Sequence, residues 1–124
     1  MYNNTYTKLT ESGINVRTGG MALIEYNWFE DAFNPVTCRY DVVNCGTWEL
    51  KGNNATSAAD NAKYNITWTD SGGGVNADTW TSTTTAYPTA KITYSYTPAS
   101  VECVHNYLAN VAGVGKGLAT LNCY

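Results

Sequence analysis

Few residues in this chain are of types that carry catalysis, and their spacing indicates no active site. Nucleophilic catalysis usually pairs a histidine with a serine or cysteine. The single histidine, His105, follows Cys103 by two residues on a predicted helix, and residues two apart on a helix do not face each other. Glycosidase chemistry needs two carboxylates, and no spacing singles out a pair among Glu25, Glu30, Asp31 and Glu49. We therefore predict that the protein is not an enzyme.

The cysteines and glycines likewise indicate no metal or phosphate site. Cys38, Cys45, Cys103 and Cys123 allow three pairings. The pairs closest in sequence would be disulfides in a secreted domain and free thiols in a cytosolic protein. Their spacing fits no zinc motif, and the run 72–74 lacks the Lys-Ser/Thr of a phosphate loop. We predict no metal, no cofactor and a mobile loop at 72–74.

The elements that would position any site are mostly strands up to Thr97. In Thr47–Lys51, Trp48 and Leu50 point to one face, and Thr47, Glu49 and Lys51 to the other. The same alternation marks 64–69 and 89–97. We expect an N-terminal hairpin within 1–29 and a further strand over 36–43.

Helical spacing begins after Pro98. Ser100 suits an N-cap, and Glu102 suits the first turn, where the helix dipole favours a carboxylate. Apolar residues then recur at Val101, Val104, Leu108 and Val111. A second short helix is expected over 118–122. The predicted fold class is α+β: an N-terminal β-hairpin and a five-stranded antiparallel meander, followed by one or two C-terminal helices.

Composition narrows the class of protein. The 124 residues suit one domain, and the aromatic content of 13% argues against disorder. A net charge of −3 argues against a strongly basic nucleic-acid binder. No apolar run approaches the ~20 residues of a membrane span, and residues 1–5 do not resemble a signal peptide. We predict no membrane partner and no small-molecule substrate.

The order of elements resembles the coat proteins of the leviviruses, the small single-stranded RNA bacteriophages. The likeness is greatest over 63–124, in the strand 63–68, a glycine-containing loop, Ala86-Tyr87, the strand 91–97, a Ser-capped helix and the ending Leu-Asn-x-Tyr. The resemblance implies a single coat-protein domain over 1–124, with a hairpin region at 1–29, a sheet at 36–97 and helices at 100–124.

The resemblance also implies a function as a capsid subunit. Such proteins form an interlocked homodimer and then an icosahedral (T=3) shell, inside which the sheet binds genomic RNA. Binding an operator hairpin would make the protein a translational repressor of replicase. The expected location is the virion, after synthesis in the cytoplasm of the bacterial host.

The RNA-binding residues implied by position lie on the polar sheet face. Thr47, Glu49, Asn65 and Thr67 stand where the family builds adenine pockets, and Tyr87 and Thr89 where it stacks and hydrogen-bonds a loop base. Lys51 and Lys63 stand near backbone contacts. From the residue types, Tyr87 can stack an unpaired base, and Lys51, Lys63 and Lys91 can meet phosphates. Glu49 and Pro88 depart from the family pattern.

A second hypothesis is a secreted, disulfide-bonded, β-rich pilin or adhesin subunit. It is favoured by Thr- and Tyr-rich strands, an even number of cysteines and a charged content of only 14%.

Overall fold

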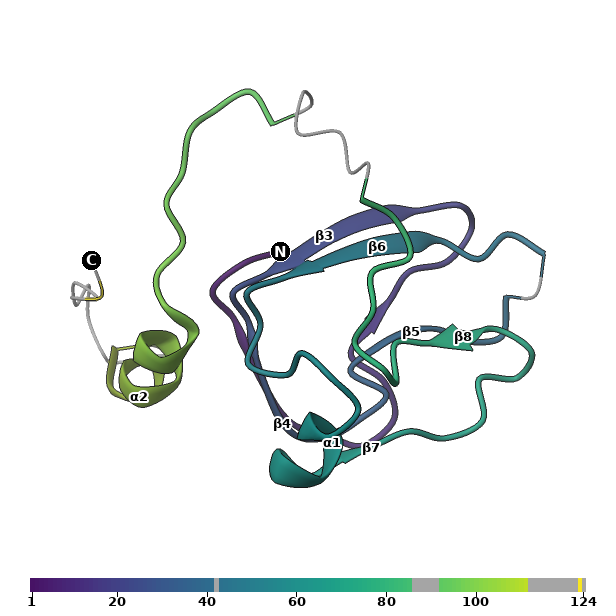
Figure 1. The fold of residues 1–124 in the computed structure, drawn as a ribbon, viewed down its shortest axis with the longest axis horizontal. Helices are drawn as coiled ribbons and strands as arrows, with labels where there is room; N and C mark the ends of the chain where they lie inside the picture. The colour runs from purple at the N-terminus through teal and green to yellow at the C-terminus, as the bar shows by residue number, and fades with distance from the viewer. Residues whose placement is uncertain (42, 86–91, 112–122, 124) are drawn as a thin grey trace.

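The computed structural model describes residues 1–41, 43–85, 92–111 and 123, and the order of elements is shown in Figure 1. The strands are β1 (Thr5–Leu9), β2 (Ile14–Asn15), β3 (Met21–Glu25), β4 (Trp28–Phe33), β5 (Val36–Cys38), β6 (Thr47–Lys51), β7 (Ile66–Thr67) and β8 (Val75–Asn76). The helices are α1 (Asp60–Lys63) and α2 (Val101–Val111).

Successive strands belong to different sheets, and each strand pairs with one that comes a full coil later. The three sheets have the orders β1-β4-β7, β2-β5-β8 and β3-β6. Their pairs are parallel apart from β5 with β8, which is antiparallel. In the first two coils the register joins Thr5 to Trp28, Ile14 to Val36 and Met21 to Thr47. The chain therefore winds as a parallel β-helix, in which each coil stacks on the one before.

A stack of three asparagines, of which Asn27 and Asn53 are buried, fixes one corner of the coils. The backbone N–H and Nδ2 of Asn4 both donate to Oδ1 of Asn27, at 3.0 and 3.1 Å. The backbone N–H of Asn27 donates to Oδ1 of Asn53 at 2.9 Å, and its Nδ2 does so at 3.3 Å. The stack satisfies polar groups that burial would otherwise leave unpaired. Each asparagine follows a residue in the left-handed region: Asn3 (φ 54°), Tyr26 (φ 51°) and Gly52 (φ 65°).

The core lies inside the coils, where equivalent positions stack on one another. Phe29 is fully buried and stacks on Tyr6 of the coil before it, with ring centroids 5.1 Å apart. Trp48 is only 1% exposed, and its indole nitrogen donates to the carbonyl of Thr81 at 3.1 Å. Inward-pointing residues of the coils thus replace the helix-covered sheet face that an α+β fold would bury.

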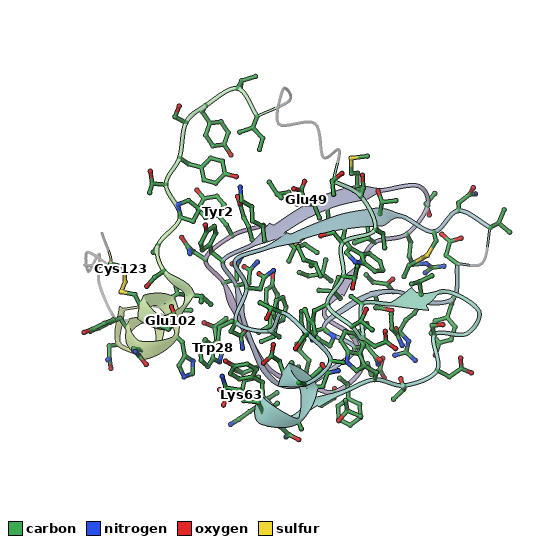
Figure 2. The ribbon with its side chains drawn as sticks, in the orientation of Figure 1. Tyr2, Trp28, Glu49, Lys63, Glu102 and Cys123 are labelled. Carbon is green, nitrogen blue, oxygen red and sulfur yellow. A yellow bond between two sulfur atoms is a disulfide. The ribbon has the colours of Figure 1, made fainter. Side chains whose placement is uncertain are left out.

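Helix α2 packs on the outside of the coils, against β1 and β4. The ring of His105 stacks on Trp28 of β4 with centroids 3.9 Å apart, and Figure 2 shows Trp28 beside the helix. The hydroxyl oxygen of Ser100 accepts the backbone N–H of Cys103 at 3.3 Å, as expected of an N-cap. A disulfide joins Cys103 to Cys123. An extended segment, residues 92–98, leads from the side of the coils to this helix (Figure 1).

The predicted α+β fold with an antiparallel meander is wrong, because the strands pair in parallel between coils. Alternation of side chains tells which face a residue takes, but it does not tell which strand is its neighbour. Local predictions fared better: β6 spans Thr47–Lys51 with Trp48 inside, and α2 begins after Ser100. The expected strand at 89–97 is absent from its described part, residues 92–97. The expected helix at 118–122 lies outside the described residues.

Candidate functional site

A cleft of about 350 Å³ lies where the β1-β4-β7 sheet turns into the β2-β5-β8 sheet. Its walls include Asn15 of β2, Arg39 and Tyr40 after β5, Thr69 after β7, and Glu11 between β1 and β2. Arg17 lies beside this cleft, because its Nη2 donates to the carbonyl of Tyr40 at 3.3 Å. The cleft together with Arg17 is called the arginine cleft below.

The two arginines occupy equivalent positions in successive coils. Each lies two residues after a member of the register pair Asn15 and Thr37. The backbone N–H of Arg39 donates to Oδ1 of Asn15 at 3.0 Å, which extends the pairing beyond the strands. Neighbouring strands lie about 4.8 Å apart. The fold therefore places two guanidinium groups on adjacent coils of one face.

Tyr40 lies between the two arginines with its ring exposed to solvent. It is 64% exposed and adopts the left-handed conformation, with φ 60°. Its hydroxyl accepts a hydrogen bond from Nη2 of Arg39 at 2.8 Å, and the guanidinium carbon of Arg39 lies 5.0 Å from the ring centroid. The guanidinium of Arg39 also donates to the carbonyls of Glu11 and Asp70, at 3.0 and 3.2 Å. These bonds fix the direction of both side chains.

The loop that follows β5 is tied down next to this pair. A disulfide joins Cys38 to Cys45 with their Cα atoms 5.8 Å apart. The carboxylate of Asp41 accepts the backbone N–H groups of Thr18 at 2.7 Å and Asn44 at 3.1 Å. These two hydrogen bonds, the one from Thr18 first, lower the pKa of Asp41. The loop therefore keeps its negative charge and its hydrogen bonds well into acidic solution.

The glycine run expected to form a mobile loop packs closely against Tyr40 and Cys38, beside the same cleft. Gly72 has φ 61°, and a Cβ placed on it would overlap the ring of Tyr40. A Cβ on Gly74 would overlap the carbonyl of Cys38. Glycine is thus needed here for close approach to β5.

This arrangement suits a ring-shaped ligand that carries a carboxylate. The guanidinium of Arg39 is held by three protein oxygens, so it mainly contributes charge to the cleft. Arg17 donates to the carbonyl of Tyr40 and lies near Asp41, and its remaining N–H groups can meet a ligand. Guanidinium groups bind carboxylates through paired, charge-assisted hydrogen bonds. The exposed ring of Tyr40 offers an apolar surface between them.

The residues predicted to bind RNA do not gather in this cleft. Thr47, Glu49 and Lys51 lie along β6 on its outward face, in the β3-β6 sheet. Lys63 ends α1, and its ammonium nitrogen lies 4.9 Å from the ring centroid of Tyr64. Figure 2 shows Glu49 and Lys63 on different sides of the coils.

The remaining members of that set lie elsewhere. Asn65 precedes β7 in the left-handed conformation, and its Nδ2 donates to Asp31 at 2.9 Å. Thr67 ends β7 in the β1-β4-β7 sheet, so it does not share a sheet with Thr47. Tyr87, Thr89 and Lys91 lie outside the described residues. The role assigned to these nine side chains stays a prediction.

Neither metal ligands nor membrane spans were found in the part of the chain that the structure describes. No group of three or more His, Cys, Asp or Glu residues there is placed to hold a metal ion. No helix there combines the length and the apolar character that crossing a membrane requires.

Arg17, Arg39 and Tyr40 carry no local signal in the sequence, because they come together only through the repeat of one coil. Arg17 and Arg39 share the offset that relates Ile14 to Val36 in the register of β2 and β5. A search for recurrences at spacings of 20–50 residues is the signal that would have found them.

Comparison with known proteins identifies close relatives. A family model described as "Pectate lyase" matches residues 1–117. Pectate lyase B of Dickeya chrysanthemi is 64% identical over 121 residues, which are 97% of this chain and 32% of that protein. The structure of Pectate Lyase C from Erwinia chrysanthemi, at pH 9.5 with 30 mM Ca²⁺, has a TM-score of 0.90 at 59% identity, over 98% of this chain and 34% of that one. A mutant of Pectate Lyase C in complex with pentagalacturonic acid matches equally well. The chain thus spans about a third of the length of these relatives.

These matches overturn the resemblance to levivirus coat proteins. The predicted capsid subunit, its interlocked homodimer, its viral RNA partner and its virion location are all wrong. The second hypothesis, a pilin or adhesin subunit, is wrong for the same reason. The prediction that the protein is not an enzyme is also wrong, because the relatives are lyases. The resemblance rested on the order of elements and on alternation, which two unrelated β-rich folds can share.

Proposed function

The chain belongs to the pectate lyase family, and on that premise we propose that the protein binds and cleaves a galacturonate polymer, with the arginine cleft as part of its sugar-binding surface. A solved relative is in complex with pentagalacturonic acid, a chain of sugar rings that each carry a carboxyl group. The arginine cleft offers two guanidinium groups on adjacent coils and an exposed tyrosine ring between them. That pairing of charge and ring surface matches one uronate unit.

The proposed reaction is an elimination that begins next to a carboxylate. A base takes the proton from the carbon bonded to the carboxylate, and the electrons of the broken C–H bond form a C=C bond to the neighbouring carbon. The C–O bond from that neighbouring carbon to the next sugar breaks, and the leaving oxygen takes a proton. In this reaction Arg17 and Arg39 bind carboxylates of the polymer, and Tyr40 holds a ring against the sheet. They position the substrate rather than transfer the proton.

Calcium accompanies one solved relative. Calcium takes six to eight oxygen ligands, usually including several carboxylates. No cluster of three or more acidic, histidine or cysteine side chains stands ready among the described residues. They therefore do not fit a calcium ion, and no step of the proposed reaction is assigned to one here.

An extracellular location fits the same proposal. Cys38 pairs with Cys45 and Cys103 with Cys123. Disulfides form and persist in oxidising surroundings such as the periplasm and the extracellular space. A protein that cleaves a polymer outside the cell must also reach that polymer there. We therefore propose that the protein acts after secretion.

The observation that carries this proposal is the position of Arg17 and Arg39 on either side of Tyr40. Arg17→Ala removes one guanidinium, and we expect the affinity for trigalacturonate to fall by about 1.5–3 kcal/mol, the usual worth of a hydrogen bond to a charged group. Arg39→Lys keeps the positive charge but removes the planar guanidinium, so we expect a smaller loss of affinity. Calorimetric titration of the complete protein measures both.

Lys8→Ala is the matched control, because Lys8 is an exposed cation on β1, in a different sheet. It removes the same charge from the net total but leaves the arginine cleft intact. If Lys8→Ala weakens binding as much as Arg17→Ala, the effect comes from net charge and the proposed site is wrong. Ultraviolet absorbance of the unsaturated product then reports cleavage for each variant.

A further inference from the structure

A second concave surface lies on another side of the coils, over the outward face of the β3-β6 sheet. There the extended segment 92–98 passes the strands and leaves a cleft of about 400 Å³, lined by Glu25, Tyr26 and Lys51 on the coils and by Tyr94 and Tyr96 on the segment. A neighbouring cleft of about 330 Å³ shares Glu25, Tyr94 and Tyr96 and adds Tyr2. Together the two form the tyrosine groove. Figure 2 shows Tyr2 on the side of the coils that faces the segment.

The floor of the tyrosine groove is built around a buried carboxylate. Glu25 is only 4% exposed, and the hydroxyl of Tyr96 donates a hydrogen bond to its Oε1. Glu25 and Lys51 are register partners in the β3-β6 ladder, so their side chains are neighbours on one face. A buried charge persists only when it is paired and hydrogen-bonded. The bond to Tyr96 thus ties the segment to the coils and gives the groove a fixed wall.

The walls offer exposed aromatic rings. Tyr2 stacks on Tyr96 with centroids 4.8 Å apart, and Tyr94 lies 5.8 Å from Tyr96 at an angle. Tyr94 is nevertheless 65% exposed, and Tyr2 is 39% exposed. Large apolar side chains gathered at the surface usually mark a place where something binds. The volumes of both clefts lie in the range of small-ligand sites, about 300–1,000 Å³.

The charges of the tyrosine groove indicate what kind of ligand it takes. Its lining side chains carry one carboxylate, Glu25, and one ammonium group, Lys51. The arginine cleft, by contrast, presents two guanidinium groups that form no salt bridge with a described residue. A neutral groove of tyrosine rings and hydroxyls complements the apolar face and the hydroxyl rim of an uncharged sugar ring.

We propose that the tyrosine groove is an accessory binding site for an uncharged pyranose oligosaccharide, on a different face from the arginine cleft. The ligand stacks on Tyr94 and Tyr2 and exchanges hydrogen bonds with Lys51 and Ser95. Such a site goes beyond the proposed function, because it involves neither Arg17 nor Arg39. It would hold the protein on stretches of polysaccharide that carry no free carboxylate.

The experiment is an NMR titration of the complete protein with three probes: β-1,4-galactotriose, fully methyl-esterified trigalacturonate and trigalacturonate. The first two probes are uncharged. Comparing them tells whether the groove binds a neutral sugar or an esterified uronate. We expect at least one of them to bind and to shift the signals of Tyr94 and Tyr2. Tyr94→Ala should weaken that binding about twofold to tenfold, the range for an aromatic contact. Tyr94→Trp, which keeps a ring, should restore it.

Tyr107→Ala is the matched control, because Tyr107 is an exposed tyrosine on α2, 53% accessible and outside the groove. The proposal is overturned if neither neutral probe binds, or if Tyr107→Ala weakens binding as much as Tyr94→Ala. It is also overturned if Arg17→Ala abolishes binding of the neutral probes, which would place them in the arginine cleft. A dimer in sedimentation that Tyr94→Ala dissociates would show that a second copy covers the groove instead. Loss of trigalacturonate binding in Arg17→Ala tests the proposed function separately.

Discussion

The arginine cleft and the tyrosine groove lie on different sheets of the same coils, and they are built in different ways. Arg17 and Arg39 hold equivalent places in successive coils, so the ladder between β2 and β5 sets their spacing. One wall of the tyrosine groove comes from segment 92–98, which is not part of any described strand. The geometry of the arginine cleft is thus set by the stacking of the coils. The geometry of the tyrosine groove depends on how segment 92–98 is anchored.

The two sites share the same coils but depend on different anchoring contacts. The coils are stabilised by stacked asparagines and stacked aromatic rings, which both sites share. The arginine cleft also needs the loop closed by Cys38 and Cys45. The tyrosine groove needs the contact between Tyr96 and Glu25 and the packing of α2 on β4. Perturbations can therefore be chosen that affect both sites, only the first or only the second.

The largest effect is expected from Asn27→Ala, which breaks the asparagine stack and should damage both sites. The side chain of Asn27 is fully buried and bonds to Asn4 and Asn53. Its loss removes four side-chain hydrogen bonds and leaves a cavity between the coils, so we expect the free energy of unfolding to fall by about 3–5 kcal/mol. Urea unfolding measures this, with the exposed Asn44→Ala as control. A loss below about 1 kcal/mol would show that the stack does not hold the coils together.

The same stack shows what could be predicted from the sequence and what could not. The bounds of β6 and the start of α2 follow from alternation, capping and helical spacing, which are local signals. The partners of each strand are non-local. Asn4, Asn27 and Asn53 recur at the coil spacing, and that recurrence is the pattern that distinguishes a stack of coils from an antiparallel meander.

The candidate sites could not be predicted from the sequence, for a related reason. Arg17 and Arg39 become neighbours only when the coil register is known. The alternation at 89–97 predicted a strand, yet its described residues pair with no sheet edge, and Tyr96 instead stacks on Tyr2. A tyrosine-rich, alternating segment can thus serve as one wall of a groove. Its composition resembles that of a strand because both must cover a half-buried surface.

A smaller effect, confined to the first site, is expected from Cys38→Ala with Cys45→Ala. This disulfide spans seven residues, and closing a loop of that size is worth about 2–3 kcal/mol. We expect that loss of stability together with weaker trigalacturonate binding, because Arg39 and Tyr40 lie inside the loop. Binding at the tyrosine groove should not change. Thermal unfolding and the two titrations measure these three quantities.

The matched control removes the other disulfide. Cys103→Ala with Cys123→Ala removes the bond between α2 and Cys123 and should leave the arginine cleft unaffected. Equal losses of trigalacturonate binding in the two double variants would mean that the loop after β5 has no special role, and that general destabilisation accounts for both.

The smallest effect, confined to the second site, is expected from alkaline pH. The hydrogen bond to Glu25, followed by burial and by the nearby charges of Glu25, Tyr94 and Tyr2, raises the pKa of Tyr96 from 10.0 to about 12. Because the pKa in the folded protein exceeds that in the unfolded chain, this contact stabilises the fold fully below pH 10 and is lost as the pH rises towards 12. Tyr96→Phe removes the ionising hydroxyl, so the variant should be less stable near pH 7 and should lose less stability between pH 10 and pH 12. Chemical unfolding across that range measures the difference, and identical pH profiles for the two proteins would show that Tyr96 does not hold segment 92–98 against the coils.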